Sequence, residues 1–438
     1  MSAVINFLHF SAFAMPVATL LYLWYRRRGI EIDHIFVFSV GFIFYSVLPF
    51  TLAKSFYFSV YDSYSAWIHA FNLVTRQTWA LYFSSLLLWY GSFVAGSWIG
   101  GKHPLTEVEK KNPVEPMALN IFFAAAIFFV FLFGYQLRSY FFWSYQKSTQ
   151  IPVFGSFVAA SIFLMSVAVC AMAYRHYKSK GKQALWKLLI HPAVISYCIV
   201  AVLLVSMGGR VVVVSSLLMG VVFFSVYIRR LRVFSVIAIF IVLILSSHII
   251  VLWRIGYRSE IFNPKHLYQY YNVQEIGIKL VPETFNVSYS LVDFLGKYSI
   301  PVIRFPTVLL SRLIGLIPSF IFPAKTAWFV DFSSLGYSIG NLSGGFNMYV
   351  SLVVNFGIVG ASFFLFGLSY ALQRLKRHAS PIAIAIYIMV SGWLAAEFFR
   401  DFEQTITKEM LEFSVLMPIA LLALSYIIMK RRKAKTNV

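Results

Sequence analysis

A group of cationic side chains is the feature of this sequence with the clearest potential for chemistry. Residues 254–345 contain eight Lys and Arg against five Asp and Glu, which leaves a net charge of +3. A guanidinium group can hold two oxygens of one phosphate, so arginines in a polar segment are typical anion ligands. The candidates are Arg254, Arg258, Arg304, Arg312 and Lys325 in this segment, Arg210 in "SMGGRVVVV" and Arg400 in "GWLAAEFFRDFEQT".

Each of these cations also has a purely structural interpretation. Arg254 and Arg258 are four residues apart, so on a helix they would share a face and could extend their charges toward a membrane surface. Arg210 could likewise anchor a turn at the interface, although the glycines before it free backbone N–H groups for an anion. Tyr257 could line a sugar site or belong to the aromatic belt that marks any membrane interface.

A transfer reaction to a hydroxyl group would also need a proton acceptor. Asp331, Glu260 and His266 are the candidates in the same segment, and their order of merit stays open. Glu397 lies at the edge of an apolar run, where a carboxylate is a functional candidate. Its alternative is an ion pair with Arg400, three residues later on the same helix face.

The segment "IPSFIFPAKTAW" at 317–328 and the residues before it are expected to position three of the cations. Pro306 can open a short helix over 306–317, because proline at the first position loses no hydrogen bond. Its apolar face would lie in lipid, with Arg312 turned toward a cavity, and Pro318 would end it. We expect a lid that presents Arg304, Arg312 and Lys325 to an anion. The alternative is an interfacial helix that only anchors the loop.

The composition predicts an all-α polytopic membrane protein. The 438 residues are 60% hydrophobic and 12% charged, whereas a soluble domain is about 25% charged. Apolar runs of about 20 residues recur, each long enough to cross a bilayer. We expect about 11 transmembrane helices, within a range of about 10–14, near 5–25, 35–53, 79–99, 117–137, 152–174, 188–207, 211–228, 233–253, 346–368, 381–398 and 410–429.

The distribution of basic residues predicts the orientation of these spans. The net charge is +21, but the cations cluster in alternate short loops, which argues for topogenic charge rather than nucleic-acid binding. The basic loops would be cytoplasmic, at 26–28, 101–111, 175–182, 229–232, 373–377 and 430–435. The chain then divides into an N-terminal bundle of about eight spans (1–253), a large external loop with short amphipathic helices (254–345) and a C-terminal bundle of about three spans with a basic cytoplasmic tail (346–438). Cys170 and Cys198 fall inside spans, so neither a disulfide framework nor a metal site is indicated.

Three segments in a fixed order resemble a known family. "GGRVVVVSSLLMGVVFF" at 208–224, "IPSFIFPAKTAW" and "GGFNMYVSLVVNFGIVGASFFLFGL" at 344–368 are similar to segments of the Wzy-type polymerases of O-antigen and other oligosaccharide repeat units. The resemblance implies a membrane glycosyltransferase at the periplasmic face of the bacterial inner membrane. Its substrates would be oligosaccharides linked to undecaprenyl pyrophosphate, with no metal or other cofactor, and its partner a membrane protein that regulates chain length. Arg210 matches the glycine-arginine position of the family, and Arg254, Arg258 and Arg304 are its loop arginines.

The sequence departs from the pattern in two places, and other functions stay open. "GNLSGGFNMY" lacks the histidine of the related O-antigen ligases, and no acidic residue occurs in 351–354, where many polymerases have one. The alternatives are an O-antigen ligase, an exopolysaccharide polymerase, a flippase for lipid-linked oligosaccharides and a metal-dependent glycosyltransferase. The last would need an acidic pair such as Glu31 and Asp33, which stand beside the basic residues 26–28.

Overall fold

The computed structural model describes most of the chain as helices. It covers residues 3–55, 70–102, 124–128, 130–132, 161–170, 172–173, 190–206, 210–239, 241, 282–317, 321–340, 345–378, 381–421, 423–424 and 427. In these ranges the only β-type pairing consists of two isolated bridges, Ile30 with Leu231 and Phe346 with Asp401. The all-α prediction is therefore confirmed for the described part of the chain.

Several of the helices suit a bilayer. Three within the described ranges are long and apolar enough to cross one, namely Ala3–Arg27, His34–Thr51 and Met348–Arg377. Shorter apolar helices cover Ser161–Cys170, Pro192–Val205, Val212–Ile228, Thr307–Leu316 and Ile382–Trp393. These findings support a helical membrane protein, while the number of about 11 spans stays a prediction.

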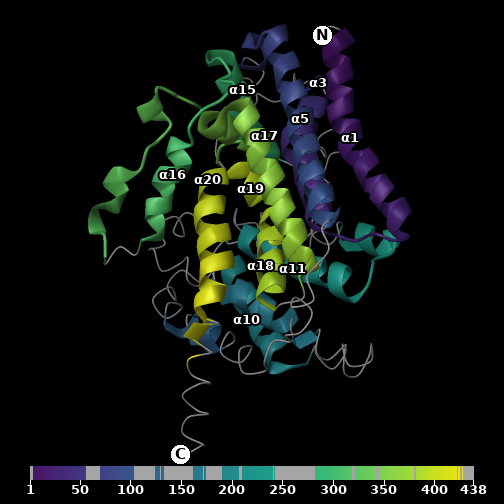
Figure 1. The fold of residues 1–438 in the computed structure, drawn as a ribbon, viewed down its shortest axis with the longest axis vertical. Coiled ribbons are helices and arrows are strands. Elements are labelled where there is room, and N and C mark those ends of the chain that lie inside the picture. Colours follow the sequence, from purple (N-terminus) through teal and green to yellow (C-terminus); the bar gives the residue numbers. More distant parts are fainter. Residues whose placement is uncertain are drawn as a thin grey trace, which may run out of the picture.

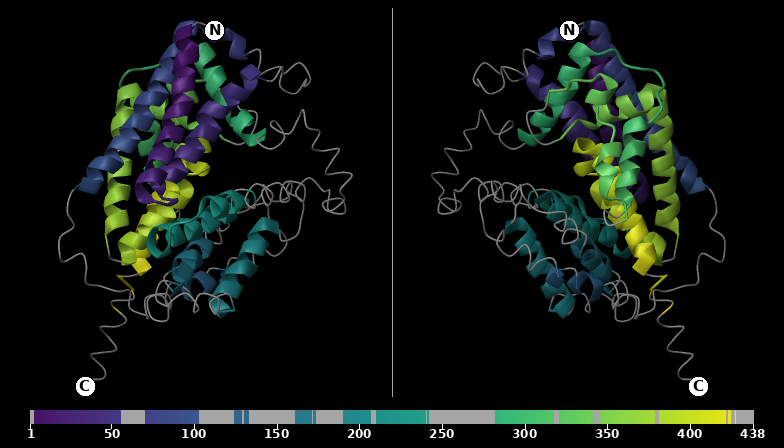
Figure 2. Two further views of the ribbon diagram at one scale, coloured as in Figure 1. Left: turned by 90° about the vertical axis from the view of Figure 1, so that its right-hand side faces the viewer. Right: turned by 90° about the vertical axis from the view of Figure 1, so that its left-hand side faces the viewer.

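Three long helices form one side of the molecule. α1 (Ala3–Arg27), α5 (Arg76–Lys102) and α17 (Met348–Arg377) run side by side (Figure 1), with α5 between the other two. The chain between α1 and α5 includes α2 (His34–Phe42), η1 (Ile43–Val47) and α3 (Leu48–Ser55). α10 (Pro192–Ser206), α11 (Arg210–Phe223) and η6 (Phe224–Ile228) lie below this bundle (Figure 2), where α11 packs on α18 (Pro381–Trp393).

The α5–α17 contact depends on aromatic residues. Tyr82 and Tyr349 meet edge to face with their ring centroids 4.8 Å apart, and Trp89 lies 4.9 Å from Tyr349. Trp89 also donates a 2.8 Å hydrogen bond from Nε1 to the carbonyl of Ile358. Between lipid-embedded helices such packing and hydrogen bonds drive association, because lipid tails are as apolar as the side chains themselves.

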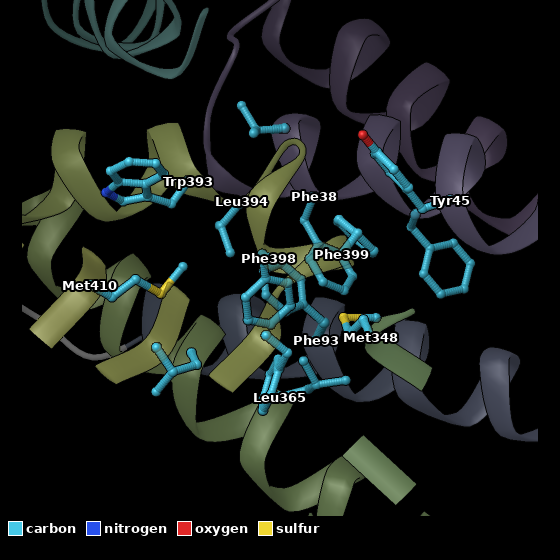
Figure 3. Close-up of a cluster of buried hydrophobic side chains, with 14 of the residues drawn as sticks. Phe38, Tyr45, Phe93, Met348, Leu365, Trp393, Leu394, Phe398, Phe399 and Met410 are labelled. Atoms are coloured by element: carbon cyan, nitrogen blue, oxygen red, sulfur yellow. The ribbon is translucent and has the colours of Figure 1, made fainter. Parts of the chain in front are cut away.

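A second aromatic cluster joins α2 to α5 and the C-terminal helices. Figure 3 shows Phe38, Phe93, Phe398 and Phe399 among the side chains of this cluster. The rings of Phe38 and Phe93 stack with their centroids 3.8 Å apart. Phe398 and Phe399 pack on Phe38 at 6.1 and 5.3 Å. All four side chains are fully buried, and each aromatic pair contributes roughly 0.5–1.5 kcal/mol beyond its buried area. This cluster packs α19 (Glu397–Arg400) against α2, and Phe398 also contacts Phe402 at the start of α20 (Phe402–Gln404).

At the other end of the bundle an ionic cluster joins three of the predicted basic loops. Asp33 accepts hydrogen bonds from Arg27 (3.0 Å) and Lys376 (2.7 Å) and caps the start of α2. Glu31 forms ion pairs with Arg27, Lys376 and Arg230. Burial alone would raise the pKa of the Asp33 carboxyl, but Lys376 and Arg27 hold it well below its usual range. Glu31 and Asp33 are thus ion-pair partners of these three cations.

Residues 282–340 do not form a simple loop. α15 (Pro282–Lys297) packs against η1, α3 and α17, and buries Phe285, Ser288, Leu291 and Phe294. An extended segment then leads to α16 (Thr307–Leu313) and the 3-10 turns η7 (Ile314–Leu316), η8 (Pro323–Trp328) and η9 (Ser333–Leu335). α20 is followed by η10 (Thr405–Leu416), which packs on α16, η7 and α18. These elements enclose the candidate site.

Candidate functional site

A cavity of about 730 Å³ lies between the α16–η9 region and the α20–η10 helix. Its wall contains apolar and hydroxyl groups as well as charges, among them Val308, Phe329, Phe346 and Tyr337. The charged residues that line it are Arg312, Lys325, Asp331, Asp401, Glu403, Lys408 and Glu412. The structure therefore brings together three of the predicted site residues, Arg312, Lys325 and Asp331, and adds four that were not predicted.

The predicted short helix is present and ends where expected. Pro306 lies just before α16, and the helical turns stop at Leu316, two residues before Pro318. One face of the helix, with Val308, Leu309 and Ser311, is buried against the protein, while Leu310 is exposed. Ser311 Oγ accepts a 2.9 Å hydrogen bond from the backbone N–H of Val330. This bond holds the chain after η8 against α16, and the helix forms part of the cavity wall.

Arg312 projects from the last turn of α16 toward the cavity. Its Nη2 donates to Asp331 Oδ1, and its guanidinium lies 4.8 Å from the centre of the Phe329 ring. The Arg312 side chain is 35% exposed and that of Asp331 is 64% exposed. An ion pair as open as this contributes only about 0–1 kcal/mol. A stronger anion can therefore displace the Asp331 carboxylate.

Lys325 and Arg304 have structural contacts. Lys325 Nζ donates to the carbonyls of Gly315 (2.9 Å) and Ile317 (2.6 Å), which are left without helical partners at the end of α16–η7. Its charge stays at the cavity wall, but the side chain also caps this short helix. Arg304 donates to the hydroxyl of Tyr337 and lies 5.1 Å from the centre of that ring. Tyr337 lines the cavity, whereas Arg304 contacts Tyr337 and is not among the residues that line the cavity.

Glu403 lines this cavity, and hydrogen bonds from two side chains of α17 orient its carboxylate. Oε2 accepts from Ser351 Oγ at 3.1 Å, and Oε1 accepts from Asn355 Nδ2 at 2.9 Å. Burial raises the pKa of Glu403 above its ordinary value, while the two side-chain hydrogen bonds and the charge of Arg312 oppose that rise. Both direct partners are neutral, so they orient the carboxylate without cancelling its charge.

A break in α17 explains why Asn355 is available for this contact. Gly357 has φ 68° and ψ 179° inside the helix, a conformation that is essentially restricted to glycine. The extended segment before α16 supplies the hydrogen bonds that the break removes: Ile358 N–H donates to Pro301, Val359 N–H to Val302, and Phe356 C=O accepts from Arg304 N–H. A helix break in an apolar bundle is tolerated where protein groups satisfy the backbone in this way.

Asn355 connects this break to both neighbouring elements. Its Oδ1 accepts a 2.7 Å hydrogen bond from Leu309 N–H in the first turn of α16. Its Nδ2 donates to the carbonyl of Ser351 at 2.9 Å as well as to Glu403. One amide group thus ties α16, α17 and α20 together, which fixes the position of Glu403 relative to the helix that carries Arg312.

The turn before α17 completes the site. Gly345 has φ 92°, and a Cβ there would overlap with the Arg400 carbonyl and with Asp401 Oδ1. Asn347 caps α17 by accepting from Tyr349 N–H at 2.9 Å, and donates to the Tyr45 carbonyl at 3.1 Å. The "GGFNMY" stretch therefore allows α17 to start directly beside α20.

Of the remaining predicted residues, the structure describes the side chain of Arg400, while the side chains of the others lie outside the described part of the chain. Arg400 contacts Asp401 at 3.4 Å rather than lining the cavity. Arg210 and Glu397 begin α11 and α19, but the placement of their side chains lies outside the described part. Residues that lie wholly outside it are Arg254, Tyr257, Arg258, Glu260 and His266.

The residues that were not predicted for the site include Glu403, its partners Ser351 and Asn355, and Lys408. Ser351 and Asn355 are four apart, so one helix face could be expected to present both polar groups in an otherwise apolar run. No sequence spacing connects them to Glu403, 48 residues after Asn355. Lys408 falls one turn after Glu403, close to the start of an expected span.

Comparisons of the chain with protein-family models, curated proteins and solved structures found no match. The proposal of a function therefore depends on the residues and geometry of this chain.

Proposed function

We propose that this chain is a membrane glycosyltransferase that polymerises oligosaccharide repeat units linked to undecaprenyl pyrophosphate. The reaction would take place at the external, periplasmic face of the bacterial inner membrane and would produce O-antigen or a related surface polysaccharide. The observation that carries the proposal is the 730 Å³ cavity, in which Arg312, Lys325 and Lys408 lie beside an oriented carboxylate. A lipid-linked sugar pyrophosphate needs cations for its phosphates and a proton acceptor for the attacking hydroxyl.

The lipid part of such a substrate also has a suitable surface. The chain that forms the cavity wall exposes large apolar side chains, including Ile303 (72%), Phe305 (70%), Ile321 (64%) and Trp328 (62%). Apolar side chains at this density favour contact with a bilayer rather than with water. A substrate with its prenyl tail in the membrane could therefore bring its pyrophosphate to the cavity without leaving the lipid.

Arg312 is the best placed pyrophosphate ligand in this cavity. Its guanidinium fork matches two phosphate oxygens, and its present partner Asp331 is mostly exposed, so exchange of the carboxylate for a phosphate costs little. Lys325 from η8 and Lys408 from η10 add positive charge to the lining of the cavity. Fixed cations near the leaving pyrophosphate would stabilise the charge that develops as its bond to the sugar breaks.

Purified full-length protein in lipid nanodiscs, given a synthetic undecaprenyl-pyrophosphate-linked repeat unit, tests the proposal. We expect a ladder of products that differ by one repeat unit on a gel. Arg312→Ala should reduce the rate about ten- to a hundredfold through loss of a charge-assisted contact. The matched control is Lys297→Ala, which removes a cation that pairs with Asp293 in α15 and lies outside the cavity.

Three results would contradict the proposal. Absence of any extended product from folded, inserted protein would exclude polymerisation. A single transfer of the oligosaccharide to a second lipid acceptor would favour a ligase. Movement of the intact substrate between leaflets of a vesicle, with no new glycosidic bond, would favour a flippase.

A further inference from the structure

The neutral hydrogen-bond partners of Glu403 distinguish it from two other carboxylates of the cavity, Asp331 and Asp401. Asp331 pairs with Arg312 and is 64% exposed, and Asp401 contacts Arg400. Glu403 instead accepts from a hydroxyl and an amide, at 3.1 and 2.9 Å. A carboxylate in a tight ion pair is a weak proton acceptor, whereas one held by neutral donors keeps its charge and its basicity.

The position of Glu403 is fixed by more than its own two hydrogen bonds. Asn355, which donates to Oε1, is itself held by Leu309 N–H and by the Ser351 carbonyl. Ser351, which donates to Oε2, lies one turn earlier on the same buried stretch of α17. The carboxylate therefore faces the cavity in one orientation, and a catalytic group requires this kind of preorganisation.

We propose that Glu403 is the general base of the transfer reaction, with Asn355 and Ser351 as positioning residues. This inference rests on the proposed function. The acceptor sugar hydroxyl would attack the anomeric carbon of the donor sugar and form the new C–O bond. The bond between that carbon and the pyrophosphate oxygen breaks, and its electron pair leaves with the lipid pyrophosphate. The hydroxyl proton passes to a carboxylate oxygen of Glu403, which later releases it to water or to the departing pyrophosphate.

The acid–base properties of this environment agree with the role. Burial raises the pKa of Glu403 above its ordinary value, and a base is most effective when its pKa approaches the working pH. The titratable and charged groups that face the cavity together with Glu403 are Arg312, Lys325, Asp331, Tyr337, Asp401, Lys408 and Glu412.

A purely structural role for Glu403 would predict a different response to Glu403→Gln. Glutamine has the same shape: its Oε1 can accept from Asn355 Nδ2, and its Nε2 can donate to Ser351 Oγ, because a hydroxyl both donates and accepts. The substitution therefore preserves both hydrogen bonds, while it removes the charge of the carboxylate and with it the proton acceptor. A structural carboxylate would tolerate it, and a general base would not.

The experiment measures turnover and substrate affinity separately in purified full-length protein. Glu403→Gln should bind an undecaprenyl-pyrophosphate-linked repeat unit as wild type does, while its turnover falls about 100-fold or more. The matched control is Asp293→Asn, a carboxylate that accepts from Lys297 and Gly340 N–H outside the cavity; it should keep wild-type turnover. Turnover of Glu403→Gln within about threefold of wild type would overturn the assignment.

A second variant keeps the inference testable if Glu403→Gln does not fold. Asn355→Asp keeps the Glu403 side chain and retains an oxygen for Leu309 N–H, but it replaces the amide donor to Glu403 with a second carboxylate beside the base. The acid limb of the pH–turnover profile should move to higher pH, and an unchanged limb would contradict the inference. Wild-type protein that forms no polymer would instead contradict the proposed function, so the two failures are distinguishable.

Discussion

Gly357 provides a test of how the site is built that does not depend on any assumed activity. It adopts φ 68° and ψ 179°, and a Cβ at this position would lie 2.6 Å from the Val302 carbonyl and 2.7 Å from Ile303 N. The backbone conformation alone costs a non-glycine residue about 1–3 kcal/mol. Displacing a packed backbone segment adds about 1–3 kcal/mol. Gly357→Ala should therefore lower the free energy of unfolding by about 2–6 kcal/mol.

The control for this variant lies on the same helix. A Cβ on Gly367 would have no atom of another element within 4 Å in the described part of the chain, so Gly367→Ala should be neutral or stabilising by up to about 1 kcal/mol. Unfolding of wild type and both variants in the same detergent, followed by heat or by titration with a denaturing detergent, gives the comparison. Equal stability of Gly357→Ala and Gly367→Ala would refute the helix break and with it the placement of Asn355.

The remaining predictions concern charge and topology. At an effective dielectric of 20, two carboxylates 4 Å apart repel by about 4 kcal/mol. After a discount for solvent screening, this repulsion should shift the acid limb of the pH–turnover profile of Asn355→Asp to higher pH by about 1–3 pH units. Since the folded-state pKa of Glu403 is raised, its contribution to stability is present at low pH and lost as pH rises through that pKa. Glu403→Gln should thus unfold at neutral pH no earlier than wild type, and a lower midpoint would contradict this. Asp331→Asn should tighten substrate binding by up to about fivefold, because a weak competing pair is removed, and weaker binding in a titration would contradict the exchange of Asp331 for phosphate. In a variant without Cys170 and Cys198, a cysteine at the exposed Ser334 should react with an impermeant thiol reagent in cells with a permeabilised outer membrane, whereas one at Ser179 should not; the reverse pattern would invert the topology.

Local sequence signals gave the helical class and the short helix after Pro306. Apolar runs report membrane helices directly, and proline positions limit where a helix starts and stops. The proximity of Arg312, Lys325 and Asp331 was also predictable, because all three belong to one compact stretch of the chain. The hydrogen-bond partners of these residues were not predictable. Lys325, for example, caps the α16–η7 carbonyls, and only the folded chain brings its ammonium group next to them.

The proton acceptor depends on long-range contacts and could not be found from spacing. Many of the polymerases that this sequence resembles have an acidic residue shortly before the "NFG" stretch of α17, and residues 351–354 contain none. The structure supplies Glu403 from α20 at that place in space, through Asn355 and Ser351. Gly357 illustrates the same limit of sequence-based prediction. A glycine in an apolar run is compatible with an unbroken helix, and only the fold places residues 301–304 beside it.

The central claim is that the chain forms glycosidic bonds between lipid-linked repeat units. The most direct measurement is the amount of free undecaprenyl pyrophosphate released by the purified protein, compared with the number of repeat units added to the product. The account predicts one pyrophosphate lipid released for each unit added, over many successive additions, and loss of both signals together in Glu403→Gln. Consumption or movement of substrate without equal release of the pyrophosphate lipid would contradict it.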